Sequence, residues 1–253
     1  MGGAPVSLRR HESRAELIVH APRLAPEVCA AALPLLRELA EAEALRVVTL
    51  RGGGEGGAAA TTAPWPLPPE RPAPEALSLL RDCVEAVAAL PMPVLALLEG
   101  PIAAEALELA LACDLRLAGR GATFAMPHLA EGRLPCCGGS QRLPRLVGLS
   151  AAFELFLGAG WDSARALALG LITEAVPAER LAEEGARWAE TIAAKAPIAA
   201  RFLKEVVRRG LEVPLEQGLL IEEDAYLLLQ TTEDRLEGIR SFLEKRPPRF
   251  RGK

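Results

Sequence analysis

Long apolar runs are missing from this 253-residue sequence, although half of its residues are hydrophobic. No stretch approaches the roughly 18 consecutive apolar residues that a membrane-spanning helix needs. Near the N-terminus, Arg9, Arg10 and Glu12 stand where a signal peptide would require an unbroken apolar segment. The sequence therefore predicts a cytoplasmic protein that does not bind a membrane.

An excess of basic charge is also absent. The chain has 29 Lys and Arg residues against 33 Asp and Glu residues, which gives a formal net charge of −4. Nucleic acids and anionic membranes are held by broad basic surfaces. We therefore expect a small-molecule or protein partner and no nucleic acid.

Short motifs for metals and nucleotides are lacking as well. The five cysteines include no CxxC pair, and no histidine stands at a spacing typical of metal ligands. The phosphate-binding patterns GxGxxG and GxxxxGK[ST] do not occur. We expect reduced thiols, no metal site and no nucleotide held by such loops.

Strands alternate with helices in the first half of the chain, which is typical of an α/β layered fold. Hydrophobic patterning predicts strands at 16–20, 46–50, 93–98 and 114–118, and helices at 26–44, 74–90 and 103–112. Glycines and prolines crowd the stretch 52–74, which predicts an irregular loop or lid there.

After Gly148 the pattern predicts helices alone. They are expected near 149–158, 163–169, 178–194, 197–209, 214–230 and 233–244. Several carry apolar stripes, yet this part of the chain has little core of its own. The stripes indicate either internal packing or docking onto a neighbouring subunit.

Two segments carry a more specific pattern. Residues 93–100 read PVLALLEG, and residues 107–114 read LELALACD. The continuation consists of Phe124, Pro127, Gly132, Pro135 and the segment GGSQRLPRLVG at 138–148. This order resembles the motif PVIAAINGxAxGGGxELALACD and its C-terminal continuation in the enoyl-CoA hydratase/isomerase (crotonase) family.

The resemblance implies a crotonase-like spiral of ββα units. Residues 1–195 would form the core with a thioester-binding cleft, and residues 196–253 a helical region that assembles a homotrimer or a dimer of trimers. The substrate would be a thioester of coenzyme A or of an acyl-carrier phosphopantetheine arm, with no separate cofactor. Two backbone N–H groups would polarise the thioester carbonyl and stabilise an enolate.

The resemblance also places the two N–H donors. Ala59 occupies the first donor position, unless the stretch 52–74 is simply a disordered loop. The second donor falls at Glu105, preceded by Ala104, where the family has a GGG run. A carboxylate at Glu105 would oppose an enolate unless it points away. Pro135 is counted with these substrate-binding residues.

Glu108 matches the first of two carboxylates that handle one water in the family's hydratases. It stands three residues after Glu105 and therefore on the same helical face. The second carboxylate position holds His128, whose ordinary pKa suits proton transfer near neutral pH. Cys136 stands where some relatives carry aspartate, so a Cys136/His128/Glu108 nucleophile group is a further hypothesis.

Three functions are compatible with these residues. The first is an enoyl-CoA hydratase/isomerase-like enzyme, a lyase or isomerase, in which Glu108 and His128 share proton transfer. The second is a thioester hydrolase that depends on Cys136. The third is a catalytically silent homologue that binds acyl thioesters or an active paralogue, suggested by the loss of the GGG run and of one carboxylate.

Overall fold

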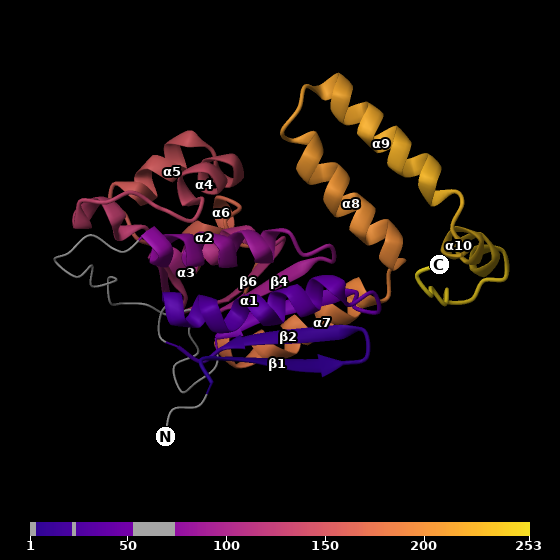
Figure 1. Cartoon of the computed structure of the whole chain (residues 1–253), viewed down its shortest axis with the longest axis horizontal. Helices are drawn as coiled ribbons and strands as arrows, with labels where there is room; N and C mark the ends of the chain where they lie inside the picture. Colours follow the sequence, from indigo (N-terminus) through magenta and orange to yellow (C-terminus); the bar gives the residue numbers. More distant parts are fainter. Residues whose placement is uncertain (1–3, 22–23, 53–73) are drawn as a thin grey trace.

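A six-stranded sheet forms the centre of the molecule in the computed structural model, which describes residues 4–21, 24–52 and 74–253 (Figure 1). The first two strands are antiparallel, and all later neighbours run parallel. In sheet order the strands are β1 (Val6–His11), β2 (Arg14–Val19), β3 (Val47–Gly52), β4 (Val94–Leu98), β6 (Leu115–Gly119) and β9 (Glu174–Val176). The predicted α/β fold is confirmed.

Both faces of this sheet are covered, as parallel sheets require. Successive side chains of a strand point to opposite faces. Accordingly Val94 and Ala96 of β4 belong to the main core beneath α1 (Pro26–Glu41) and α2 (Pro74–Ala88), whereas Leu95 and Leu97 belong to a smaller core.

Helix α7 (Leu181–Ala193) closes that smaller core. It packs against β3, β4 and β6. A side chain at Gly185 would come within 2.5 Å of a Leu97 methyl, so the glycine permits the close approach of the helix to the sheet.

A second, three-stranded sheet has the order β5 (Pro101–Ala103), β7 (Thr123–Ala125) and β8 (Trp161–Asp162). Strands β5 and β7 are parallel, with Ala103 opposite Ala125. The C-terminal ends of β5 and β7 therefore lie next to each other. The next elements along the chain, α3 (Ala104–Ala112) and the 3-10 helix η1 (Pro127–Glu131), begin there side by side.

The expectation that only helices come after Gly148 is wrong, because β8 and β9 lie in this part of the chain. Strands of two and three residues are too short to show a period, and their partners in the sheets define them. Helix α4 (Gly139–Val147) was not predicted, whereas the other helices, including the 3-10 helix η2, fit the expected positions. They are α5 (Leu149–Phe156), α6 (Ser163–Ala168), η2 (Ala178–Arg180), α8 (Pro197–Gly210), α9 (Leu215–Leu229) and α10 (Glu233–Leu243).

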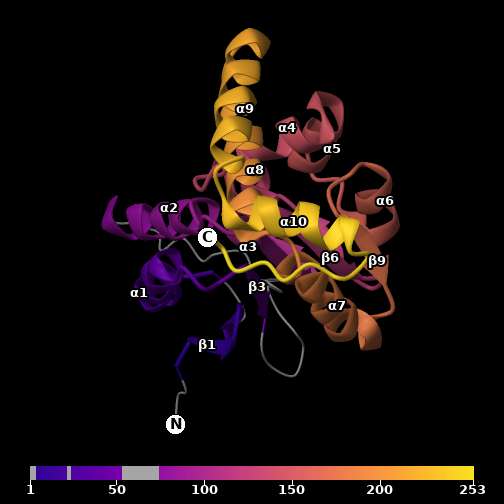
Figure 2. The ribbon, with the colours of Figure 1, turned by 90° about the vertical axis from the view of Figure 1, so that its right-hand side faces the viewer.

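Helices α8, α9 and α10 form an arm at the C-terminal end, in which α8 and α9 pair as a hairpin that projects from the sheets (Figures 1 and 2). Basic side chains of α8 hold the arm to the core. Lys204 donates to the Met92 carbonyl at 2.9 Å, and Arg208 donates to the Ala112 carbonyl at 3.0 Å. Among the described helices, none has the length and hydropathy of a membrane span.

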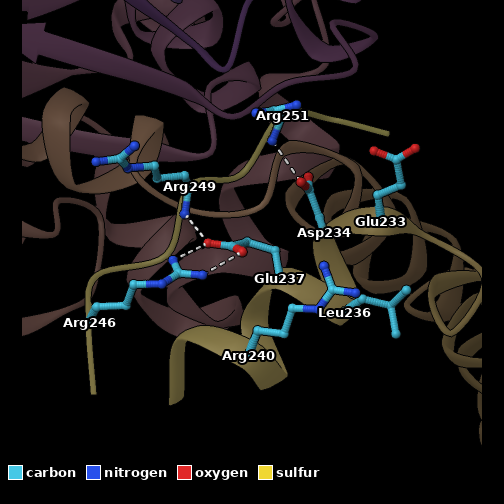
Figure 3. A pocket seen from close by; sticks show the side chains of 8 residues that line it. All are labelled: Glu233, Asp234, Leu236, Glu237, Arg240, Arg246, Arg249 and Arg251. Carbon is cyan, nitrogen blue, oxygen red and sulfur yellow. Dashed lines mark hydrogen bonds and ion pairs between the residues drawn. The ribbon is translucent and has the colours of Figure 1, made fainter. Parts of the chain in front are cut away.

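The last residues of the chain fold back along α10, beside a pocket of about 640 Å³ (Figure 3). Arg246 forms two hydrogen bonds with Glu237, at 2.6 and 3.0 Å. These bonds, together with the N–H of Arg249, lower the pKa of Glu237 to about 2. Asp234 accepts the N–H of Arg251 at 2.6 Å. The charged groups of Asp234, Glu237 and Arg246 thus attach the tail to α10.

Candidate active site

Helix α3 begins with a strained residue, because Ala104 has a φ of +51°. This left-handed conformation costs energy for a residue other than glycine. The turn places Glu105 in the first turn of α3, where helix N–H groups have no intrahelical acceptor. The Glu105 N–H is thus available at the positive end of the helix dipole.

Glu108 lies one turn further along α3 and is completely buried. Its Oε1 accepts the N–H groups of Cys137 at 2.8 Å and of Gly139 at 2.7 Å. A side chain at position 139 would lie 2.9 Å from this oxygen, so the contact requires glycine. These two bonds fix the carboxylate and leave Oε2 directed toward the neighbouring η1.

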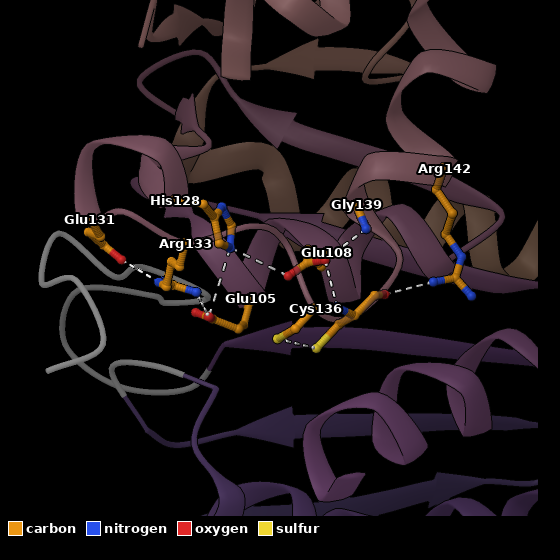
Figure 4. Close-up of polar contacts among 9 residues, drawn as sticks. Glu105, Glu108, His128, Glu131, Arg133, Cys136, Gly139 and Arg142 are labelled. Atoms are coloured by element: carbon orange, nitrogen blue, oxygen red, sulfur yellow. Dashed lines mark hydrogen bonds and ion pairs between the residues drawn. The ribbon is translucent and has the colours of Figure 1, made fainter. Parts of the chain in front are cut away.

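His128, on η1, faces that oxygen (Figure 4). Its Nε2 lies 3.6 Å from Glu108 Oε2 and 3.9 Å from Glu105 Oε1. The His128 side chain is 1% exposed, and within the described part of the chain neither ring nitrogen has a hydrogen-bond partner. Glu108 Oε2 is equally unpartnered there. Two buried groups that can each carry a proton, the Glu108 carboxylate and the His128 ring, therefore face each other.

Arg133 compensates the unusual carboxylate at Glu105. Its guanidinium contacts Glu105 Oε1 and Glu131 Oε2, each at 2.5 Å. Burial by itself lowers the pKa of Arg133, but the bonds to Glu131 and Glu105 outweigh it and raise the pKa. Arg133 was not among the predicted site residues, since it stands 28 residues from Glu105 and no motif pairs them.

Cys136 is half-buried beside this cluster, and its Sγ lies 3.5 Å from Sγ of Cys137. A hydrogen bond from Cys137 lowers the pKa of Cys136 and raises that of Cys137. Because the ring of His128 has no hydrogen-bond partner among the described residues, the hypothesised Cys136–His128 pair is not formed. The Cys136 sulfur turns to its neighbour instead.

The other predicted substrate-binding residues differ in their placement. Ala104 is buried at the start of α3, next to Glu105. Pro135 is half-buried in the connection between η1 and α4, directly before Cys136. Ala59 lies outside the described residues. The structure thus brings Glu105, Glu108 and His128 into one cluster, with Pro135 and Cys136 on the segment beside it.

Comparison with known proteins agrees with this arrangement. A family model described as Enoyl-CoA hydratase/isomerase matches residues 27–253. The chain belongs to the enoyl-CoA hydratase/isomerase family. It is 42% identical over 182 residues to the mouse "Enoyl-CoA hydratase domain-containing protein 2, mitochondrial", covering 69% of this chain and 60% of the relative. It is 39% identical over 181 residues to the mouse methylglutaconyl-CoA hydratase, covering 70% and 58%.

Solved structures match almost the full length of this chain. Enoyl-CoA hydratase from Bacillus anthracis superposes with a TM-score of 0.90 at 32% identity, covering 98% of this chain and 100% of that chain. A putative enoyl-CoA hydratase from Streptomyces coelicolor gives 0.91 at 28% identity, with 98% and 94% covered. The crotonase fold is therefore shown. By contrast, the chain spans about three fifths of the length of the curated relatives above.

Proposed function

We propose that this chain is an enzyme that adds water to an enoyl thioester, or shifts its double bond, through an enolate. The observation that carries the proposal is a buried pair of atoms 3.6 Å apart, Glu108 Oε2 and His128 Nε2, neither of which has a hydrogen-bond partner among the described residues. Both atoms can reach one water held between them and the substrate. Addition of water needs this arrangement, because one group must act as base and the other as acid.

The proton balance of hydration can be written for this pair. The base takes a proton from water as the hydroxyl bonds to the β-carbon, and the acid gives a proton to the α-carbon. With Glu108 as carboxylate and His128 as imidazolium, the step ends with a carboxylic acid and a neutral imidazole. The total charge of the pair stays constant. Two glutamates in these positions would instead cycle one negative charge between them.

Enolate stabilisation is assigned to the Glu105 N–H at the start of α3, together with the Ala59 N–H as the other donor. The helix dipole favours negative charge at this end. The ion pair between the Glu105 carboxylate and Arg133, at 2.5 Å, offsets the charge that would otherwise oppose an enolate. Arg133 therefore supports catalysis at a position where glutamate replaces glycine.

The proposed substrate is a thioester of coenzyme A or of an acyl-carrier phosphopantetheine arm, with Ala104 and Pro135 beside the reacting carbons.

The proposed assembly is a homotrimer or a dimer of trimers. Several relatives carry the word mitochondrial in their names. For this chain, a cytoplasmic location stays a prediction.

Hydration of crotonyl-CoA and of 3-methylglutaconyl-CoA, measured as loss of the enoyl thioester absorbance, tests the proposal. We expect turnover of at least one of them. Glu108→Gln and His128→Gln should each lower kcat about 10²- to 10⁴-fold, the usual contribution of a general acid or base. His20→Gln is the matched control, since His20 is exposed and contacts Ser7.

Two results would contradict the proposal. One is an unchanged rate in Glu108→Gln on a substrate that the wild-type chain turns over. The other is tight binding of coenzyme A thioesters without turnover of any enoyl substrate, which would identify a catalytically silent homologue.

A further inference from the structure

Three side chains of the cluster converge on one small volume (Figure 4). Glu105, Glu108 and His128 each offer a ligand atom, and these atoms all lie within 4.8 Å of one another. Their side chains are 8%, 0% and 1% exposed. Two come from successive turns of α3 and one from η1, so the site is built on regular elements.

The buried charges around this volume do not balance. Glu105, Glu108 and Glu131 are carboxylates, and Arg133 is the cation paired with two of them. With neutral imidazole at His128, two negative charges remain uncompensated among the described residues of this buried site. Buried charges of this kind are normally paired or coordinate a metal. A divalent cation would neutralise the cluster.

Free lone pairs point into the same volume. Within the part of the chain that the structure describes, neither Glu108 Oε2 nor His128 Nε2 has a hydrogen-bond partner, and both side chains are more than nine-tenths buried. A buried polar atom without a partner is costly, and such an exception requires an explanation. An ion bound between the two atoms would satisfy both.

Hydrogen bonds from neighbouring residues orient the two carboxylates, as such bonds orient the ligands of metal ions. The N–H groups of Cys137 and Gly139 hold Glu108 by Oε1 and leave Oε2 free. Arg133 holds Glu105 by Oε1, the oxygen that also lies nearest His128 Nε2. Around a tetrahedral ion with bonds of about 2.0–2.2 Å, ligand atoms lie about 3.4 Å apart. The observed separations from His128 Nε2 to the two carboxylates, 3.6 and 3.9 Å, are slightly longer, and all three ligand atoms lie within 4.8 Å of one another.

We propose that Glu105, Glu108 and His128 bind one divalent transition-metal ion of the Zn²⁺ class. One imidazole and two carboxylates suit Zn²⁺ and its neighbours Co²⁺, Mn²⁺ and Fe²⁺. Three protein ligands leave a coordination position for water. This assignment departs from the expectation of no metal, because the ligands meet through the fold and not through a spacing visible in the sequence.

Metal binding has a consequence that rests on the proposed function. The ion occupies Glu108 Oε2 and His128 Nε2, the two atoms that hydration needs for proton transfer. We therefore expect added Zn²⁺ to inhibit crotonyl-CoA hydration by the chelator-treated protein, and renewed chelation to restore it.

The binding test uses the full-length chain, freed of metal by a chelator, with no substrate present. Co²⁺ is titrated by visible absorption, and Zn²⁺ by equilibrium dialysis. We expect one ion per chain. His128→Gln and Glu105→Gln should each weaken binding about 100-fold or more, since even outer-shell changes cost about 10- to 100-fold. His20→Gln and Glu154→Gln are the matched controls and should bind as the wild type does.

Thermal unfolding gives a second readout that also reports on folding. Zn²⁺ should raise the Tm of the wild-type chain and leave that of His128→Gln unchanged, because a ligand stabilises only a protein that binds it. A variant that is folded but does not respond to Zn²⁺ supports the assignment.

Three outcomes would overturn the proposal. The first is no binding of Co²⁺ or Zn²⁺ by the wild type. The second is binding that survives His128→Gln. The third is an intense thiolate-to-cobalt band that disappears in a Cys136→Ser/Cys137→Ser variant, which would place the ion on the thiols near Glu108. Hydration by a wild type that binds no ion would leave the proposed function standing.

Discussion

Glu105 carries a charge where the crotonase motif has glycine, and the structure shows how this charge is accommodated. Arg133 pairs with its Oε1 at 2.5 Å, and His128 Nε2 lies 3.9 Å from the same oxygen. The motif alone could indicate Glu105, Glu108 and His128, because each occupies a defined place in it. It could not indicate Arg133, whose role depends on the course of the chain after η1.

The cysteines also show what sequence position does not reveal about a single residue. Sequence position suggested that Cys136 faces His128, but the direction of a side chain depends on local backbone geometry. Here the sulfur lies against Sγ of Cys137, at 3.5 Å. Cys29, Cys83 and Cys113 are buried, which agrees with the expectation that they pack in the core.

Alkylation should therefore begin at Cys136. It is the half-exposed thiol, and the hydrogen bond from Cys137 lowers its pKa, so its thiolate persists at a lower pH than that of an ordinary cysteine. Burial raises the pKa of Cys113 to about 12, which makes that thiol slow to react. Mass spectrometry after brief iodoacetamide treatment should show a first adduct that Cys136→Ser abolishes and Cys113→Ser retains. A first adduct on Cys29 or Cys83 would contradict this ordering.

Among the elements, α3 and η1 were predictable to different degrees, and α4 was not predicted. The helix near 103–112 was visible in its apolar pattern, whereas η1 is a single short turn without a period of its own. Both are brought together by the pairing of β5 with β7, two three-residue strands that the pattern did not reveal. The site therefore depends on contacts between elements that only the folded chain defines.

The attachment of α8 to the core depends on Asp114. This carboxylate accepts the N–H of Val94 at 2.7 Å and contacts Lys204 and Arg208, each also at 2.7 Å. Burial lowers the pKa of Lys204, and the contact with Asp114 partly opposes this. Asp114 thus joins β4, the end of α3 and the arm.

Replacing Asp114 should consequently loosen the arm. We expect Asp114→Ala to lower the free energy of unfolding by about 2 kcal/mol, since it removes the carboxylate that two cations contact and leaves the Val94 N–H without its acceptor in a partly exposed site. Urea denaturation measures this. Glu212→Ala, which removes an exposed pair with Arg145 at 3.8 Å, is the control and should change stability by less than about 0.5 kcal/mol. Equal effects of the two variants would refute the role of Asp114.

At the scale of the whole molecule, the arm exposes apolar side chains that a monomer would leave in water. Leu211 is 78% exposed, Leu215 is 76% exposed and Phe242 is 83% exposed. Large exposed apolar patches mark interaction surfaces. The sequence left open whether the stripes on these helices pack internally or against a neighbour, and their exposure favours the neighbour.

The proposed trimer makes a direct prediction. Sedimentation velocity of the full chain should give a species of three or six copies of 26.9 kDa. Leu227→Glu together with Leu228→Glu, both on exposed positions of α9, should shift it toward the monomer, because charge on a buried interface is costly. Ala186→Glu on the exposed side of α7 is the control. A monomeric wild type would show that the arm serves another purpose.

The proposed mechanism requires that Glu108 and His128 act together on one water. A double-mutant cycle of kcat/KM for enoyl thioester hydration tests this requirement, with Glu108→Gln, His128→Gln and the combined variant. Residues that act as a unit are strongly non-additive. We predict that the double variant is no more than about tenfold slower than the slower single variant. Losses that multiply fully, or single variants as fast as the wild type, would contradict the mechanism.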